Sequence, residues 1–111
     1  MKKNYSDEVK ELIKRYNKEE DIVLLKSDIY ITKRNNTTTE EIKREILEVQ
    51  KLYYTEKQER QDGVRYALFF KYSNKKGRCY VIEFNNKIKV VTVFPLGKKT
   101  LKKYELKRFI K

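Results

Sequence analysis

The sequence predicts an α+β fold in which N-terminal helices pack on one face of an antiparallel β-meander of three or more strands. Apolar residues recur at helical spacing in two stretches before Gly63. After Gly63, β-branched and aromatic residues alternate with polar ones in three stretches, which turn-forming residues separate. The 111 residues suit a single domain with a modest core. We expect residues 1–63 to be mainly helical and residues 64–111 to form the meander and a tail.

The first helix is expected to begin at Ser6, because a serine hydroxyl can accept a hydrogen bond from a free N–H of the first turn. Asp7 and Glu8 follow and suit the positive end of a helix. Four apolar residues then lie at i, i+3, i+4 and i+7: Val9, Leu12, Ile13 and Tyr16. Asn17 is a suitable end for this helix.

Residues 22–34 fit two structures. The run Ile29-Tyr30-Ile31-Thr32 favours a strand by its β-branched and aromatic side chains. Ser27 and Asp28 could instead cap a short helix. We expect short extended segments in this region.

The second helix is predicted to run from Thr38 to about Tyr54. Thr38 and Glu41 have the spacing of a capping box, in which each side chain binds a free backbone N–H. The apolar stripe of this helix consists of Ile42, Ile46, Val49 and Tyr53. The polar residues 56–63 are expected to form a loop.

Three strands are predicted over residues 65–72, 78–84 and 88–94, with Pro95 ending the third. Asn85 and Asn86 form the second turn, because asparagine tolerates a positive φ. A three-residue turn would set Glu83 opposite Lys89 as an ion pair. That register also places four apolar side chains on one face: Ile82, Phe84, Ile88 and Val90. The apolar residues of the tail, residues 96–111, are too sparse to predict an amphipathic helix.

The residue types exclude several kinds of chemistry. The chain has no histidine, which is the commonest general base and metal ligand. Cys79 is the only cysteine, so neither an intrachain disulfide nor a metal-binding spacing is possible, and we expect no metal and no cofactor. Because Cys79 lies in an apolar strand, a buried thiol is the favoured interpretation over a nucleophile. A lone cysteine and the absence of an apolar span favour a cytoplasmic protein.

The positive charge is confined to one half of the chain. Residues 1–63 contain 14 lysines and arginines and 14 acidic residues, so that half is neutral. From Val64 onward, 14 cationic residues face two acidic ones, Glu83 and Glu105, and this half carries the whole net charge of +12. A basic surface of this kind predicts a nucleic-acid partner. A membrane partner is not expected, because no basic amphipathic helix is evident.

The basic sheet and tail are the candidate nucleic-acid-binding surface. Lysines would contact phosphate and tyrosines would stack on bases. The binding residues predicted here are Lys75, Lys76, Lys98, Lys99, Lys102, Lys103 and Tyr104. Tyr72 and Tyr80 are further candidates for stacking. The alternative interpretation is a solvated charged surface over core tyrosines.

Ribonuclease chemistry without histidine is a second candidate. Lysine and arginine can stabilise the charge on a phosphorane, and a Lys or Tyr whose pKa is lowered by neighbouring cations can move a proton. In this hypothesis Arg65, Lys71 and Arg78 contact phosphate and Tyr80 is the general acid or base.

A capped helix followed by Gly77-Arg78-Cys79-Tyr80-Val81-Ile82-Glu83-Phe84 and Lys89-Val90-Val91-Thr92-Val93-Phe94-Pro95 resembles the RelE/ParE-like toxins and their barnase–EndoU–colicin relatives. The resemblance covers roughly residues 38–104. RelE-type toxins cleave mRNA with Lys, Arg and Tyr side chains, and Arg65, Lys71, Arg78 and Tyr80 are the nearest counterparts here. Some of these families carry a histidine that this chain lacks.

These observations favour RNA binding, with metal-independent endoribonuclease activity as what the resemblance implies. A non-catalytic protein that binds nucleic acid, duplex DNA included, is the main alternative. A module that recruits an acidic, antitoxin-like protein is another, since such a partner would complement a +12 surface.

Overall fold

The computed structural model describes residues 4–16, 18–24, 33, 35, 37–71 and 76–105, leaving aside the side chains of residues 19 and 103–105. Its helices are α1 (Ser6–Lys14), α3 (Thr39–Leu47) and α4 (Lys98–Glu105), with short 3₁₀ turns at Glu19–Asp21 and Val49–Lys51. Its strands are β1 (Ile22–Leu24), β2 (Leu52–Arg60), β3 (Gly63–Lys71), β4 (Gly77–Phe84) and β5 (Ile88–Leu96). The α+β class is therefore confirmed.

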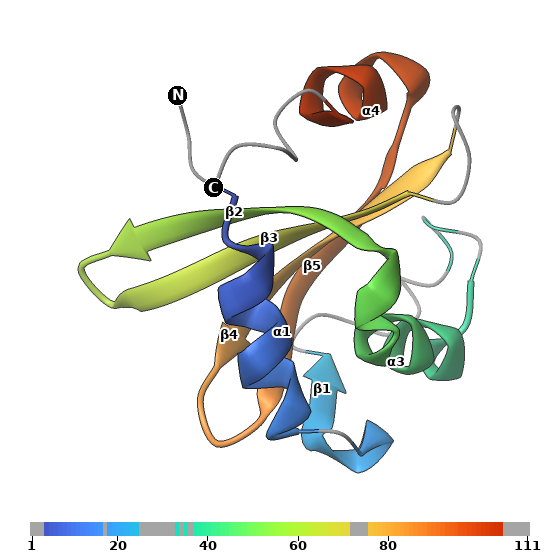
Figure 1. Cartoon of the computed structure of the whole chain (residues 1–111). Helices are drawn as coiled ribbons and strands as arrows, with labels where there is room; N and C mark the ends of the chain where they lie inside the picture. The colour runs from blue at the N-terminus through green and yellow to red at the C-terminus, as the bar shows by residue number, and fades with distance from the viewer. Residues whose placement is uncertain are drawn as a thin grey trace.

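The strands form one sheet in the order β1-β5-β4-β3-β2 (Figure 1). β2 to β5 make an antiparallel meander, and the short β1 joins its far edge parallel to β5. The first 63 residues thus supply two strands besides the helices. Among the described residues, no helix is long and apolar enough to cross a membrane.

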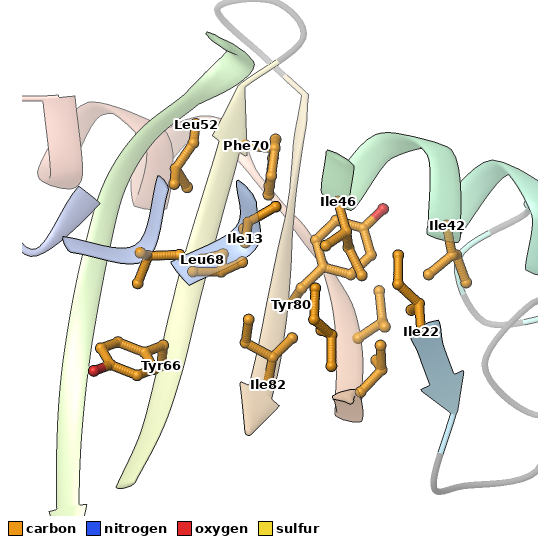
Figure 2. Close-up of a cluster of buried hydrophobic side chains, with 14 residues drawn as sticks. Ile13, Ile22, Ile42, Ile46, Leu52, Tyr66, Leu68, Phe70, Tyr80 and Ile82 are labelled. Atoms are coloured by element: carbon orange, nitrogen blue, oxygen red, sulfur yellow. The ribbon is translucent and has the colours of Figure 1, made fainter. Parts of the chain in front are cut away.

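Two cores lie on opposite faces of the sheet. One face is covered by α1 and α3, and we call it the helix-side face. There, Val9 and Ile13 of α1 and Ile42 and Ile46 of α3 pack against inward side chains of the strands (Figure 2). On the α4-side face, Leu101 of α4 packs in a second cluster with six residues: Tyr53, Tyr54, Ala67, Phe69, Cys79 and Leu96. The sheet is therefore covered by helices on both faces, whereas the sequence predicted helices on one face only.

Residues 98–105 of the tail form the helix α4, which needs only one well-placed apolar residue. Leu101 is 1% exposed, and the exposed Lys98 and Lys102 lie on the solvent side. The sequence did not predict an amphipathic helix here, because a helix that docks by one turn needs no long apolar stripe.

The second predicted helix was too long. α3 ends at Leu47, and Glu48 leaves helical geometry with ψ 64°. Residues 52–60, predicted as the helix end and a loop, instead form β2 and pair with β3 from Thr55↔Leu68 to Arg60↔Gly63. A polar edge strand with one exposed side does not show the apolar alternation on which the prediction depended.

The N-terminal caps differ in how well they were predicted. Thr38 caps α3, accepting a 3.2 Å bond from the N–H of Glu41, as expected. Ser6 is not the cap of α1: it is the first helical residue and is buried, and its hydroxyl donates to Asn4 Oδ1 at 2.7 Å and lies 3.1 Å from the Thr55 hydroxyl.

The three later strands and their register are close to the prediction. Glu83 lies opposite Lys89 and Phe84 opposite Ile88, and Asn86 has φ 62° in the turn between them. The carboxylate of Glu83, however, pairs with Arg65 of β3 at 2.6 Å and not with Lys89. β5 also continues through Pro95 to Leu96. Of the ambiguous stretch 22–34, residues 22–24 are a strand as expected, and Lys33 is helical, which differs from the extended segments expected. Residues 25–32 and 34 lie outside the described residues.

Gly77 lies in close contact with Leu101 of α4, which gives a test of the α4 packing. A Cβ at this position would stand 2.5 Å from the Phe70 carbonyl oxygen and 2.7 Å from Cδ2 of Leu101. We expect Gly77→Ala to lower the free energy of unfolding by about 1–3 kcal/mol in urea denaturation, because backbone and helix must both shift. Gly97→Ala is the matched control, since its Cβ would meet nothing within 4 Å. Equal effects of the two substitutions would contradict this close packing.

Candidate nucleic-acid interface

One end of the sheet gathers cations from three elements. Gly77 pairs with both Lys71 and Leu96, so the end of β3, the start of β4 and the end of β5 lie side by side. α4 begins two residues after Leu96. Five lysines therefore belong to this end, and we call them the lysine cluster: Lys71, Lys76, Lys98, Lys99 and Lys102.

The α4 lysines are placed against the usual charge preference of a helix. Lys98, Lys99 and Lys102 are exposed, and within the described part of the chain none of them forms an ion pair. The first turn of α4 contains no acidic residue. A helix N-terminus carries a partial positive charge and favours anions. Lysines in the first turn therefore repel the helix dipole and raise the positive potential there. A bound phosphate would relieve that repulsion.

The predicted catalytic residues do not form one site. Arg65 and Lys71 project from the α4-side face of β3, whereas Arg78 and Tyr80 project from the helix-side face of β4. The period of two in each strand separates them. Of the remaining predicted residues, Tyr72 and Lys75 lie outside the described residues, as do the side chains of Lys103 and Tyr104.

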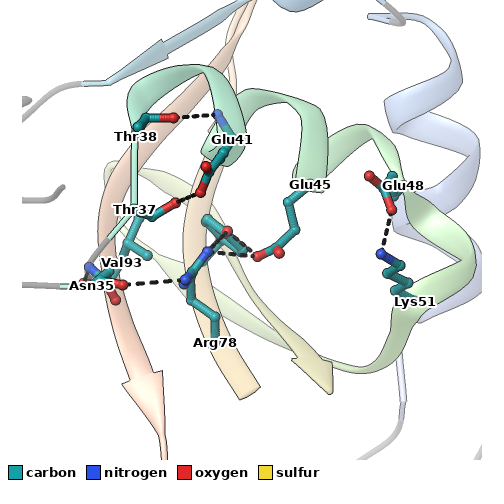
Figure 3. Close-up of polar contacts among 10 residues, drawn as sticks. Asn35, Thr37, Thr38, Glu41, Glu45, Glu48, Lys51, Arg78 and Val93 are labelled. Carbon is teal, nitrogen blue, oxygen red and sulfur yellow. Dashed lines mark hydrogen bonds and ion pairs between the residues drawn. The ribbon is translucent and has the colours of Figure 1, made fainter. Parts of the chain in front are cut away.

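Glu45 holds Arg78 beneath α3 (Figure 3), and Tyr80 belongs to the same cluster of hydrogen bonds. Nη1 of Arg78 donates to Glu45 Oε1 at 3.3 Å and to the Tyr80 hydroxyl at 3.2 Å, and Nη2 donates to the Asn35 carbonyl at 3.3 Å. The Tyr80 hydroxyl donates to the same Glu45 oxygen. The side chains of Arg78 and Glu45 are each 15% exposed. This Glu45 cluster fastens α3 to β4 by buried polar contacts.

The protonation of the Glu45 cluster argues against proton transfer by Tyr80. Burial, and next the charge of Glu45, raise the pKa of Tyr80, although Arg78 opposes the shift. The net shift of this pKa is therefore upward, although we had expected neighbouring cations to lower it. Tyr80 is 0% exposed, so its ring cannot stack on a base from solvent. The partly exposed Phe94 on the α4-side face is an aromatic side chain that the sequence reasoning missed as a stacking candidate.

Cys79 is not a reactive group in this structure. Cys79 is buried, and burial raises the pKa of its thiol to about 12, which favours the predicted inert thiol over a nucleophile. A hollow of about 260 Å³ at β1 is lined by Glu20, Lys43, Thr39 and apolar side chains. The described residues contain no group of three or more His, Cys, Asp or Glu that could hold a metal ion.

Comparisons of the chain with protein-family models, with curated proteins and with solved structures find no match. The resemblance to RelE/ParE-like toxins therefore stays a prediction from the strand pattern.

The Glu45 cluster gives a pH-dependent test. Burial raises the pKa of Glu45 above its ordinary value of 4.5, against the hydrogen bond from Tyr80 and the charge of Arg78. A group whose pKa is raised on folding stabilises the protein below its unfolded pKa, and this stabilisation is lost as the pH rises through the folded pKa. The unfolding free energy of the wild type minus that of Glu45→Gln should therefore fall as the pH rises above 4.5. Urea denaturation at a series of pH values measures it, and a difference that rises with pH would contradict it.

Proposed function

We propose that this chain binds nucleic acid, RNA in the first place, through the lysine cluster. The observation that carries the proposal is the placement of Lys98 and Lys99, both exposed, in a first turn of α4 that contains no acidic residue. Selection for stability alone would favour acidic residues there. An array of surface lysines can bind several phosphate groups of one nucleic-acid chain. Each of these contacts releases a counterion, which favours binding.

RNA is the favoured ligand because the lysine cluster borders a half-exposed sheet face. Val81, Thr92 and Phe94 are partly exposed on the α4-side face. Single-stranded RNA offers unstacked bases that such an aromatic and apolar surface can accommodate, while lysines at its border hold the backbone. A rigid duplex can present only its backbone to the same surface.

The geometry favours a protein that binds RNA and does not cleave it with the residues of the Glu45 cluster. A general acid must reach the leaving oxygen of the substrate within hydrogen-bonding distance. Tyr80 and Arg78 lie under α3 and are bound to Glu45, so they act as structural residues in this proposal.

RNA binding is tested with two double variants, each of which removes two positive charges from one end of the sheet. We expect the double variant Lys98→Gln/Lys99→Gln to weaken binding of a single-stranded RNA about tenfold at 0.1 M salt, and to reduce the slope of log K against log salt by about 1.4. The matched control is Lys87→Gln/Lys89→Gln. The span of β4 (Gly77–Phe84) places these two lysines about 25 Å away, at the other end of the sheet. Fluorescence anisotropy over a salt series measures both quantities.

The same variants separate a specific surface from general basicity. Equal losses in the two double variants would mean that total charge, and not the lysine cluster, drives binding. Because glutamates in the first turn of α4 suit its dipole, Lys98→Glu/Lys99→Glu should raise the melting temperature by about 2 °C while it abolishes binding. A salt slope near zero for the wild type would overturn the proposal.

Cleavage is tested in the presence of EDTA. We expect RNA to remain intact at protein concentrations that saturate binding. Specific cleavage that survives in EDTA and disappears in Lys71→Ala would instead support the ribonuclease that the RelE-like resemblance implies. Arg78→Ala is unsuitable for this test, because it leaves Glu45 as a buried charge without its partner and destabilises the fold.

A further inference from the structure

β2 is the terminal strand of the sheet, and its outer edge is only partly covered. The N–H of Tyr5 donates to the Thr55 carbonyl at 3.0 Å, and the N–H of Thr55 donates to Asn4 Oδ1 at 3.1 Å. Asn4 also donates to the Tyr53 carbonyl at 3.4 Å. The backbone groups of Thr55 therefore point away from β3, and the N-terminal segment occupies them.

The rest of the β2 edge follows by alternation. Successive residues of an antiparallel strand turn their N–H and C=O groups alternately toward and away from the neighbour. From Thr55 to Arg60 the pairing with β3 is regular, so Lys57 and Glu59 turn their backbone groups outward, as Thr55 does, and Gln58 turns its groups toward β3. Among the described strands, none pairs with this edge. The end of the β2–β3 hairpin also extends beyond α1 (Figure 1).

The charges along this edge are complementary when two copies of the edge run antiparallel to each other. The segment is Glu56-Lys57-Gln58-Glu59-Arg60, which is neutral within a chain of net charge +12. Opposite charges stand at equal distances from Gln58, with Lys57 against Glu59 and Glu56 against Arg60. Opposite charges directly across two strands stabilise a sheet, and like charges destabilise it.

We propose that this edge of β2 pairs with the same edge of a second copy of the chain, antiparallel and with a two-fold axis at Gln58. Lys57 of each copy then faces Glu59 of the other. Since these are the outward-pointing residues, each such pair exchanges two backbone hydrogen bonds. The two pairs make four bonds around Gln58. The ladder stops at Thr55, whose outward groups are already bound by Asn4 and Tyr5.

Only this register satisfies both the backbone and the charges. A shift by one residue would set an outward-pointing residue against an inward-pointing one, which breaks the hydrogen bonds. A shift by two residues would centre the pair on Lys57 or on Glu59 and place like charges opposite each other. The segment therefore recognises its own copy better than an arbitrary extended peptide.

The pairing has a consequence for the arrangement of the two copies. In an antiparallel ladder, side chains directly opposite each other lie on the same face, so the two-fold axis is perpendicular to the sheet. Both copies then present α4 on the same side of one continuous sheet. A five-residue edge is at the small end of protein interfaces, so we expect a dimer with a dissociation constant of about 0.01–1 mM.

Disulfide trapping tests the register without nucleic acid. At the two-fold axis, the Cα atoms of the two Gln58 residues would be about 4.5 Å apart, as in a non-hydrogen-bonded pair, which suits a disulfide. We expect Gln58→Cys to form a covalent dimer under mild oxidation at least about tenfold faster than Arg60→Cys. Arg60→Cys is the matched control, because residue 60 is more exposed and lies on the same face but faces residue 56 of the copy. Cys79 is buried and does not compete. Equal rates would overturn the proposal.

Sedimentation velocity of the full chain gives a second measurement. Glu59→Lys, which sets two lysines opposite each other, should abolish the dimer, and the double variant Lys57→Glu/Glu59→Lys should restore it. Asp62→Lys, in the exposed hairpin turn, makes the same change in charge and should leave the dimer intact. A wild-type chain that stays monomeric to about 1 mM would overturn the proposal. Binding of this edge to an extended segment of another protein in place of the copy would overturn it too.

Discussion

The register between β3 and β4 determines which cations of this protein reach solvent. Each strand turns alternate side chains to opposite faces, and the pairing of Phe70 with Arg78 and of Lys71 with Gly77 sets the phase of both strands. Arg78 and Tyr80 consequently enter the helix-side core, where Glu45 of α3 neutralises the arginine. Lys71 stays at the border of the opposite face. A slip of β4 by one residue would turn Arg78 to the α4-side face and Glu83 to the helix-side face, which would leave a charge in each core.

The Glu45 cluster illustrates how a basic sequence distributes its charge. Arg78 is a structural cation, because its carboxylate and carbonyl partners are buried with it. Arg65 is likewise occupied by Glu83 on the α4-side face. These two arginines therefore contribute little to the potential at the surface. Lys98 and Lys99 lie in the first turn of α4, at its positive end, so the potential there exceeds what a count of residues suggests.

The two proposed surfaces use different halves of the chain. The lysine cluster belongs to the basic half beyond Val64, and the pairing edge of β2 belongs to the neutral half before Gly63. A neutral edge allows two highly charged copies to approach, because the repulsion between distant charges is screened within about 8 Å at physiological salt. The fold thus separates a surface suited to anions from a surface suited to self-association.

Local pattern by itself determined the features that depend on neighbours in sequence. Thr38 was predicted as a cap because capping needs only the next three residues, and the Glu83↔Lys89 register followed from one short turn. Tertiary structure alone decided the others. β2 is a strand because β3 offers it a partner, and α4 is a helix because the glycine at position 77 lets Leu101 approach the sheet. The predicted site of Arg65, Lys71, Arg78 and Tyr80 was divided between two faces, since residue type does not reveal which face of a strand a helix will cover.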